Sequence, residues 1–265
     1  RNTMRFMLGS LSDYYVSDET VSNEMPELER WVLHRLCELD EKVQQGYDSY
    51  DFQGVFQAIF TFATVDLSSF YFDIRKDVLY CDGDTIERRS ARTVLNLLFH
   101  RLTTWLAPIL VFTMEEVWLE RYPDKDSSVH LVDIPNTPSE WRDDKLAKKW
   151  SIVRNYRRLV TSALELQRVD KVIGSSLEAA PTVHVQDKDA LSVLESVPFK
   201  DICITSDIKL TSANPPKDAY RSSEGPAVDF KKSVVTKCER CWKILPDVGN
   251  FKHPSTCGRC STALK

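Results

Sequence analysis

Residues 52–77 read FQGVFQAIFTFATVDLSSFYFDIRKD, and this stretch has the clearest periodic pattern in the 265-residue chain. Large apolar residues recur there at intervals of three and four: Phe52, Phe56, Ile59, Ala63, Leu67, Phe70 and Ile74. Because an α-helix turns once every 3.6 residues, this spacing predicts a long helix with one buried face. A heavily aromatic stripe is more typical of a hydrophobic core than of a cofactor site.

The same helical spacing flanks this stretch on both sides. Apolar residues recur at helical intervals over 28–43, 94–112 and 146–164, and Pro108 is expected to kink the second of these segments. The chain has only eight glycines and contains no run of about 18 uncharged apolar residues. The composition therefore predicts a mainly helical protein with no membrane span.

Between and after the helices, shorter elements are expected. Ser128–Val132 reads as a short strand within an irregular connection. The helix that contains residues 146–164 is expected to end at Gly174. Beyond Gly174 we expect a small α/β module, with a helix over 187–197 and strands at 181–185, 201–205 and 208–211, followed by a loop over 212–226. This organisation predicts three domains: a helical bundle (1–170), a small α/β junction with linker (171–226) and a C-terminal module (227–265) that contains four of the cysteines.

Four cysteines near the end form two CxxC pairs, Cys238/Cys241 and Cys257/Cys260. The intervening segment is long enough for a short β-hairpin, so the four thiolates could close around one Zn²⁺ at about 2.3 Å. Two disulfides or two redox CxxC sites are the alternatives. A closed four-cysteine site has no open coordination position, which makes the metal structural. Its binding energy, on the order of 10–16 kcal/mol, would fold a module that is too small to have its own core.

Positive charge is concentrated in two segments although the whole chain carries a net charge of −4. Residues 145–171 and 231–265 each contain eight Lys/Arg and two acidic residues, a net charge of +6. In the second segment Arg240, Trp242 and Lys243 lie beside a metal ligand. A cationic and aromatic surface of this kind indicates nucleic-acid binding. An equally good interpretation of Trp242 is packing beneath the metal.

Sequence motifs for catalysis are lacking in these 265 residues. There is no glycine-rich phosphate loop, GxSxG or HExxH motif, and the five histidines are scattered. A helical bundle with a basic metal module favours a binding role, and a folded RNA with unpaired bases is the ligand that fits best.

Several strings together resemble the C-terminal part of bacterial-type isoleucyl-tRNA synthetases. They are RNTMRFML (1–8), SFYFDIRKD (69–77), LAPIL (106–110), SVHL (128–131) and KVIGSSLEA (171–179). The bundle strings are shared in weaker form with the valine, leucine and methionine enzymes of the same class. Among these enzymes, the terminal CxRCW…CGRC module resembles only that of the isoleucine group.

This resemblance implies the anticodon-binding bundle of a class I synthetase, followed by a junction and a zinc finger that hold the anticodon stem-loop of tRNA(Ile). Arg1 and Arg5 of the bundle, with Arg240, Trp242 and Lys243 of the metal module, are then the expected RNA contacts. ATP-dependent activation of isoleucine and editing would belong to domains outside these residues. The family signatures His-x-Gly-His and Lys-Met-Ser-Lys-Ser are absent here, so this segment alone is expected to be inactive.

The resemblance further implies a monomeric parent chain in the bacterial cytoplasm, or alternatively in the mitochondrial matrix. Because the sequence starts without methionine, we expect it to be a piece of a longer protein. Three rival functions stay open: the tail of another class I synthetase such as the valine enzyme, the zinc-finger segment of a DNA repair glycosylase, and a protein-interaction bundle with a structural zinc.

Overall fold

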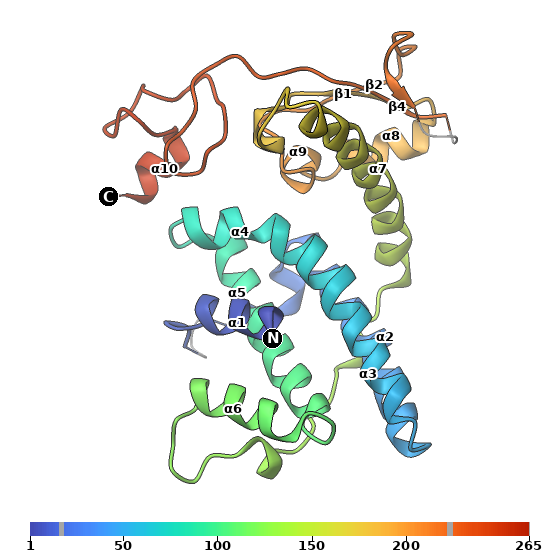
Figure 1. Cartoon of the computed structure of the whole chain (residues 1–265), viewed down its shortest axis with the longest axis vertical. Coiled ribbons are helices and arrows are strands. Elements are labelled where there is room, and N and C mark those ends of the chain that lie inside the picture. Colours follow the sequence, from blue (N-terminus) through green and yellow to red (C-terminus); the bar gives the residue numbers. More distant parts are fainter. Residues whose placement is uncertain (16–18, 222–224, 265) are drawn as a thin grey trace. The chain divides into compact units, whose positions relative to one another are not determined.

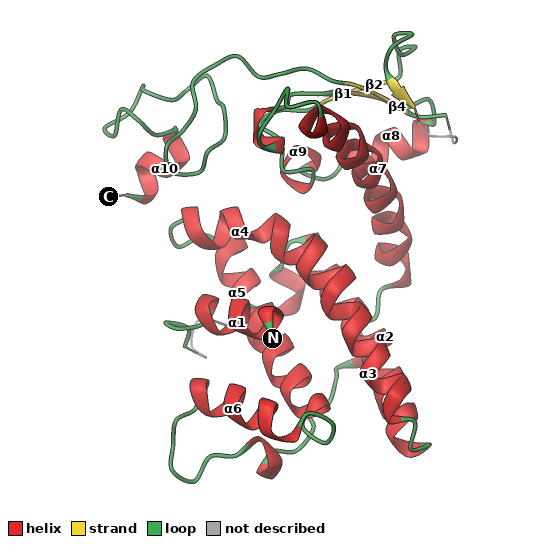
Figure 2. Ribbon diagram, viewed as in Figure 1, coloured by secondary structure: helices red, strands yellow, loops and turns green. Residues whose placement is uncertain are grey.

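The computed structural model describes residues 1–15, 19–221 and 225–264. Contacts divide the chain into two compact units: unit 1 is Arg1–Tyr80 with Asp84–Leu146, and unit 2 is Cys81–Gly83 with Ala147–Lys265. Figure 1 labels the elements in chain order. Helices predominate, and the named strands of the described residues all belong to unit 2 (Figure 2). The predicted mainly helical fold is therefore confirmed.

Unit 1 is built mainly from helices. In order they are α1 (Asn2–Ser10), the 3₁₀ turn η2 (Ser22–Glu24), α2 (Glu27–Asp48), α3 (Phe52–Thr61), the π-helix η3 (Phe62–Tyr71), α4 (Phe72–Cys81, whose last residue belongs to unit 2), α5 (Ile86–Leu106), α6 (Val111–Arg121), and the 3₁₀ turns η4 (Val129–Leu131) and η5 (Ser139–Trp141). Helix α2 packs against α3 and α5, and α5 packs against α1 and α6. The core lies between these helices and contains the fully buried Trp105, Phe99 and Tyr71.

The predicted long stripe is only partly buried. Ile59, Leu67, Phe70 and Ile74 are core residues, but 46% of Phe52 and 38% of Phe56 are exposed, so the prediction is wrong for the first two turns. The reason is that η3 is a π-helix, which has more residues per turn than an α-helix. The buried face of α3 therefore runs through Val55 and Ile59 and continues to Phe62, the first residue of η3.

Two further predictions for this region are wrong. Pro108 does not kink a helix, because α5 ends at Leu106 and α6 starts at Val111. The expected strand Ser128–Val132 forms the 3₁₀ turn η4, where the Ser128 hydroxyl oxygen accepts from the His130 N–H and Glu115 Oε2 accepts from the Val129 N–H at 2.9 Å. These hydrogen bonds satisfy the backbone without a partner strand.

One helical stretch, Phe52–Cys81, is long and apolar enough to cross a membrane by length and composition alone. This is weak evidence, because the core helix of a folded domain passes the same test. Here the stretch packs against α2 and carries the buried Asp66 and Arg75. The predicted absence of a membrane span stays a prediction.

His100 of α5 is held among aromatic rings. Its Nε2 lies 2.8 Å from the Tyr122 hydroxyl, and its ring meets Phe99, Trp118 and Tyr122. Burial, followed by the charges of Arg121 and Arg101, lowers the pKa of His100 from 6.5 to about 4. The imidazole is therefore neutral in the folded protein at pH 5, whereas the unfolded chain is protonated.

This lowered pKa predicts a loss of stability in mild acid. As the pH falls, the unfolded state takes up the proton before the folded state does. The contribution of His100 to the free energy of unfolding is therefore fully present above pH 6.5 and is lost as the pH drops toward 4. Between pH 7 and 5 we expect His100 to account for about 1–2 kcal/mol. Urea unfolding of the wild type and His100→Gln at both pH values measures this difference. Equal pH dependence in the two proteins would contradict the prediction.

Unit 2 combines one long helix, a small sheet and the cysteine module. Its elements are α7 (Asp144–Val169, of which residues 147–169 belong to this unit), the 3₁₀ turn η6 (Ser176–Glu178), β1 (Thr182–His184), α8 (Lys188–Glu195), α9 (Phe199–Ile202), β2 (Lys209–Thr211), β3 (Tyr220–Arg221), β4 (Ala227–Asp229) and α10 (Gly258–Ala263). Trp150, Val153, Val160 and Leu164 form the buried face of α7, as their helical spacing predicts.

The sheet has the strand order β2-β1-β4-β3. Strand β1 pairs in parallel with β2 and antiparallel with β4, so that Val183 lies between Leu210 and Val228. Strand β4 also pairs with β3, which lies inside the segment predicted as a loop; Ser222 and Ser223 of that segment lie outside the described residues. The α/β character is as predicted.

Two local predictions in unit 2 are wrong. Residues 201–205 do not form a strand, because α9 and a following turn occupy them; the Cys203 N–H donates to the Phe199 carbonyl at 2.9 Å. Gly174 does not end α7, which stops at Val169. The turn is made at Lys171, whose φ of 58° is in the left-handed region.

Candidate metal centre and nucleic-acid interface

The four cysteines of the two CxxC pairs come together in unit 2. The sulfur atoms of Cys238, Cys241, Cys257 and Cys260 all lie within 4.8 Å of one another, and all four residues are buried. The Sγ atoms of Cys241 and Cys257 are 3.8 Å apart. A tetrahedral ion with ligands at about 2.3 Å requires sulfur–sulfur separations of about 3.8 Å. The cluster could therefore hold a metal ion.

The chain around the first pair forms a tight loop. The Cys238 N–H donates to the Lys243 carbonyl, the Trp242 N–H donates to the Cys238 carbonyl, both at 2.9 Å, and Lys237 and Ile244 form an antiparallel bridge. Residues 242–256, all of which the structure describes, otherwise form turns and bends, so the expected β-hairpin in the spacer is replaced by irregular structure.

The second pair lies at the start of α10. Cys257 precedes its first turn and Cys260 lies within it. Gly258 between them has no room for a side chain, because a Cβ atom would come within 2.7 Å of the Phe251 ring. Its N–H donates to Asp247 Oδ2 at 2.9 Å. The sequence CGRC thus brings the backbone close to its neighbours and directs both sulfur atoms inward.

The thiols of the cluster differ in acidity. Burial raises the pKa of Cys241 and of Cys260. Burial also opposes ionisation of Cys238, but hydrogen bonds from the backbone around Cys241 and Cys257 outweigh it and lower its pKa to about 6. The protein environment alone therefore favours the thiolate of Cys238 and disfavours those of Cys241 and Cys260, and a bound cation would stabilise several thiolates together.

Arg240 and Lys243, two of the predicted RNA contacts, have partners within unit 2. The Lys243 ammonium pairs with Asp201 at 2.7 Å, and the neighbouring Ile244 N–H donates to the Ser206 hydroxyl oxygen at 2.7 Å. The Arg240 guanidinium donates to the backbone carbonyl oxygen of Cys81, which is grouped with this unit. The contacts of Lys243 and Ile244 hold the cysteine module against the residues around α9.

Trp242 is exposed. Sixty-two per cent of its side chain is accessible, so it does not pack beneath the cysteine cluster. Its φ of 64° lies in the left-handed region, where a residue with a Cβ is strained by about 1–2 kcal/mol. The Lys237 ammonium lies 5.9 Å from the centroid of its ring. The chain therefore holds a large aromatic ring in solvent, beside a cation, on a strained backbone.

Arg1 directly precedes α1 of unit 1 and Arg5 lies on it, and both are exposed. They are four residues apart on the same face of the helix, since the Arg5 N–H donates to the Arg1 carbonyl. Both line a groove in unit 1. Phe56 and Phe60 form the other wall of this groove. Sequence reasoning did not identify this wall, because the two residues have the helical spacing of core residues.

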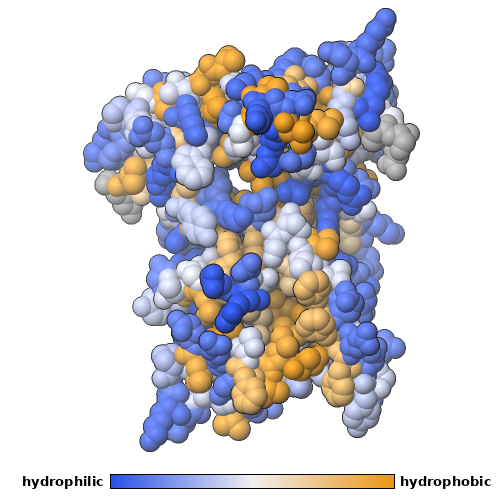
Figure 3. All heavy atoms as spheres, viewed as in Figure 1, coloured by the Kyte–Doolittle hydropathy of each residue, from blue (hydrophilic) through white to orange (hydrophobic). Residues whose placement is uncertain are grey.

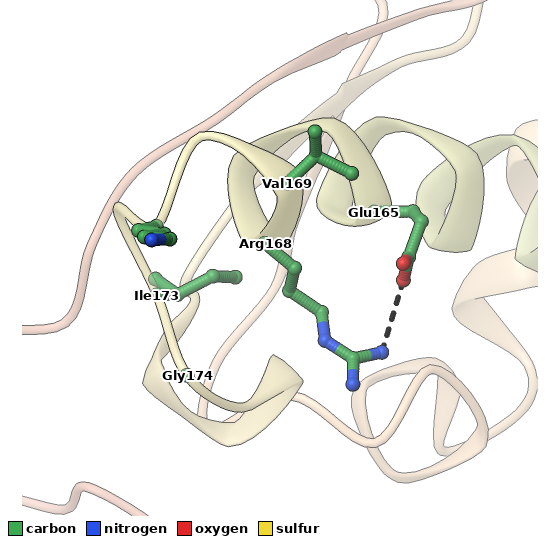
Figure 4. A pocket seen from close by; sticks show the side chains of 6 residues that line it. Glu165, Arg168, Val169, Ile173 and Gly174 are labelled. Atoms are coloured by element: carbon green, nitrogen blue, oxygen red, sulfur yellow. Dashed lines mark hydrogen bonds and ion pairs between the residues drawn. The ribbon is translucent and has the colours of Figure 1, made fainter.

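A smaller surface pocket of about 440 Å³ lies in unit 2, where α7 ends. Figure 4 shows Arg168 extended toward Glu165, with which it forms an ion pair at 2.9 Å. Val169 and Ile173 supply apolar lining, and Lys171 completes it. These residues offer no nucleophile with an adjacent base, so the pocket is a surface feature of the basic helix and not a reaction centre.

Comparison with known proteins identifies the fold. Residues 29–183, more than half of the chain, match the family described as the anticodon-binding domain of tRNA ligase. The isoleucine–tRNA ligase of Ruegeria pomeroyi is 62% identical over 267 residues, which cover all of this chain and 28% of the relative. Those of Brucella abortus and Agrobacterium fabrum are 49% and 47% identical, again over all of this chain and 28% of each relative.

These matches decide between the interpretations that the sequence left open. The family match covers α2 through most of β1, which a repair glycosylase would not explain, and the similar proteins are isoleucine enzymes. The chain spans 28% of the length of these relatives. On this evidence the chain belongs to the family of anticodon-binding domains of tRNA ligases.

Proposed function

We propose that this chain is the part of an isoleucine–tRNA ligase that recognises the anticodon stem-loop of tRNA(Ile). The observation that carries the proposal is the 62% identity to an isoleucine–tRNA ligase along the whole chain, within which the anticodon-binding match lies. In the parent enzyme, activation of isoleucine with ATP and its transfer to tRNA would be performed by residues outside these 265. Binding energy gained here would help to position the distant acceptor end.

The metal module would be a zinc finger with one structural Zn²⁺, held by the thiolates of Cys238, Cys241, Cys257 and Cys260. A four-thiolate set suits zinc, and a complete set leaves no position for a substrate. The ion would supply folding energy and fix the loop that carries Trp242. The bundle would be of the class I synthetase type. The division into three domains at residues 170 and 226 stays a prediction.

The proposed RNA contacts differ in availability. Arg1, Arg5 and Trp242 are exposed and suited to direct contact with phosphates and with an unpaired base. Arg240 and Lys243 would reach RNA only by exchanging their present partners. The strained backbone at Trp242 supports a binding role for its ring, because strained backbone conformations cluster at functional sites.

We further propose that the parent enzyme is a monomer in the bacterial cytoplasm. The seven cysteines all lie in the described residues, are buried and form no disulfide, which suits a reducing compartment. The similar proteins named above are bacterial.

Filter binding tests the proposal directly. The parent enzyme should bind tRNA(Ile) more tightly than the same tRNA with a changed anticodon, and raising the salt concentration should weaken both because phosphate contacts release counterions. Equal affinity for the two RNAs would refute anticodon recognition.

Trp242→Gly separates the two roles of this residue. Glycine tolerates a φ of 64°, so stability should be unchanged or higher. Loss of one stacked base should weaken RNA binding by about 1–3 kcal/mol, or roughly 5- to 150-fold. Trp242→Tyr keeps an aromatic ring and serves as the control. Unchanged affinity of Trp242→Gly would exclude stacking at this position.

A further inference from the structure

A groove of about 1300 Å³ runs across unit 1, bounded by α1, α3, η3, α6 and the C-terminal end of α5. Figure 3 shows apolar side chains gathered on this face, beside α6 and α3. Sites for small molecules usually measure about 300–1000 Å³. The groove is larger than that range and fits a macromolecular segment better.

Aromatic side chains form one wall of this groove and are left in solvent. Phe56 and Phe60 are one helical turn apart on α3, their ring centroids are 6.0 Å apart, and 53% of Phe60 is exposed. The buried Ile59 lies between them in sequence and also lines the groove. Contiguous exposed apolar surface of this kind marks an interaction site.

Apart from Arg1 and Arg5, which are proposed RNA contacts, the residues that line the groove do not favour RNA. Arg1 and Arg5 are opposed by the exposed Glu116 and Glu120, which line the same groove. The third arginine, Arg121, is engaged, because its guanidinium donates to the Leu11 carbonyl and to Asn96 Oδ1. A phosphate backbone would meet carboxylates and phenyl rings along most of this surface, whereas an apolar protein segment would bury the rings.

We propose that this groove is the docking surface for an apolar segment of the parent synthetase that lies outside these 265 residues. The inference rests on the proposed function, since it requires a longer chain. The chain spans only 28% of the length of its relatives, so most of a parent of that length is available to supply the segment. Docking there would fix the anticodon-binding bundle to the remainder of the enzyme through Phe56 and Phe60.

Thiol labelling in the intact parent enzyme tests this docking. Thr64 lines the groove and Thr61 does not, although both are exposed and lie three residues apart. Ser68 and Ser69 form a second pair of the same kind. Each is replaced singly by cysteine, a change of one or two atoms at an exposed position. The seven native cysteines of this chain are buried, which keeps the background low.

Labelling rates of the native enzyme are measured without tRNA and with tRNA(Ile). The rate of each variant in urea, where the enzyme is unfolded, gives the intrinsic reactivity of its introduced thiol and normalises the native rates. We expect Thr64→Cys and Ser68→Cys to react at least tenfold more slowly than Thr61→Cys and Ser69→Cys in the native enzyme without tRNA. Equal rates within both pairs would overturn the inference. Slow labelling that appears only with tRNA would assign the groove to RNA and also overturn it. Either result leaves anticodon binding, which filter binding measures separately, unaffected.

Discussion

Replacing Cys260 by serine is expected to release the bound metal and to unfold the segment 231–264 while unit 1 stays folded. Cys260 is completely buried in the cluster, and a serine hydroxyl does not replace a thiolate ligand. Apart from the cysteines, the apolar side chains in this cluster are Val248 and the partly buried Leu245, which are too few to hold the segment together. Structural zinc supplies on the order of 10–16 kcal/mol to such modules.

Limited proteolysis with mass spectrometry, together with elemental analysis, measures this outcome. The wild type should contain one zinc per chain and resist cleavage over residues 231–264, whereas Cys260→Ser should contain none and be cut there. Cys37→Ser is the matched control, because Cys37 is also buried but lies in unit 1, where its thiol donates to the Pro138 carbonyl. A Cys260→Ser protein that keeps one zinc and resists protease would contradict the proposed four-thiolate site.

The four-cysteine cluster was predictable because its signal is local. Two CxxC pairs place their sulfur atoms by loop geometry that requires only a few neighbouring residues, and the structure brings all four within 4.8 Å. The same holds for the buried face of α7, since Trp150, Val153 and Val160 follow an uninterrupted α-helical period. Elements that obey one local rule throughout are the ones that sequence reasoning recovers.

The sequence did not predict features that depend on more than the local apolar pattern. The exposure of Phe56 follows from the π-helix η3, which shifts the buried face without changing the apolar character of the sequence. Likewise, the sequence SVHLV suits a strand until Glu115, more than ten residues earlier, accepts the Val129 N–H. In the candidate site, the sequence indicated Arg240 and Lys243 as RNA contacts but not their partners within the protein, Cys81 and Asp201, which come from elsewhere in the chain.

The string SFYFDIRKD, which contributed to the family resemblance, has a structural explanation in unit 1. Its Tyr71 and Arg75 both bind the carboxylate of Glu29 in α2. The Arg75 guanidinium donates to both carboxylate oxygens, at 2.6 and 2.5 Å, and the Tyr71 hydroxyl donates at 3.0 Å. Glu29 and Tyr71 are fully buried and Arg75 is 9% exposed. Burial opposes the charge on Arg75, but Glu29 outweighs it and raises the Arg75 pKa further.

Glu29→Gln should therefore destabilise unit 1 by about 3–5 kcal/mol, because it leaves the Arg75 charge buried without a counter-charge. Urea unfolding followed by tryptophan fluorescence measures the change. Asp73→Asn is the matched control: it makes the same carboxylate-to-amide change in an exposed pair with Lys76, which contributes about 0–1 kcal/mol.

A double variant, Glu29→Leu with Arg75→Met, distinguishes an unpaired charge from lost packing. If the loss in Glu29→Gln comes from the uncompensated guanidinium, removing both charges should restore much of the stability, since apolar replacements of buried ion pairs are often neutral. A double variant at least as unstable as Glu29→Gln would show that the three-residue hydrogen-bond network, and not charge compensation, holds α2 to α4. A loss in Glu29→Gln no larger than that in Asp73→Asn would contradict the burial of this ion pair in unit 1.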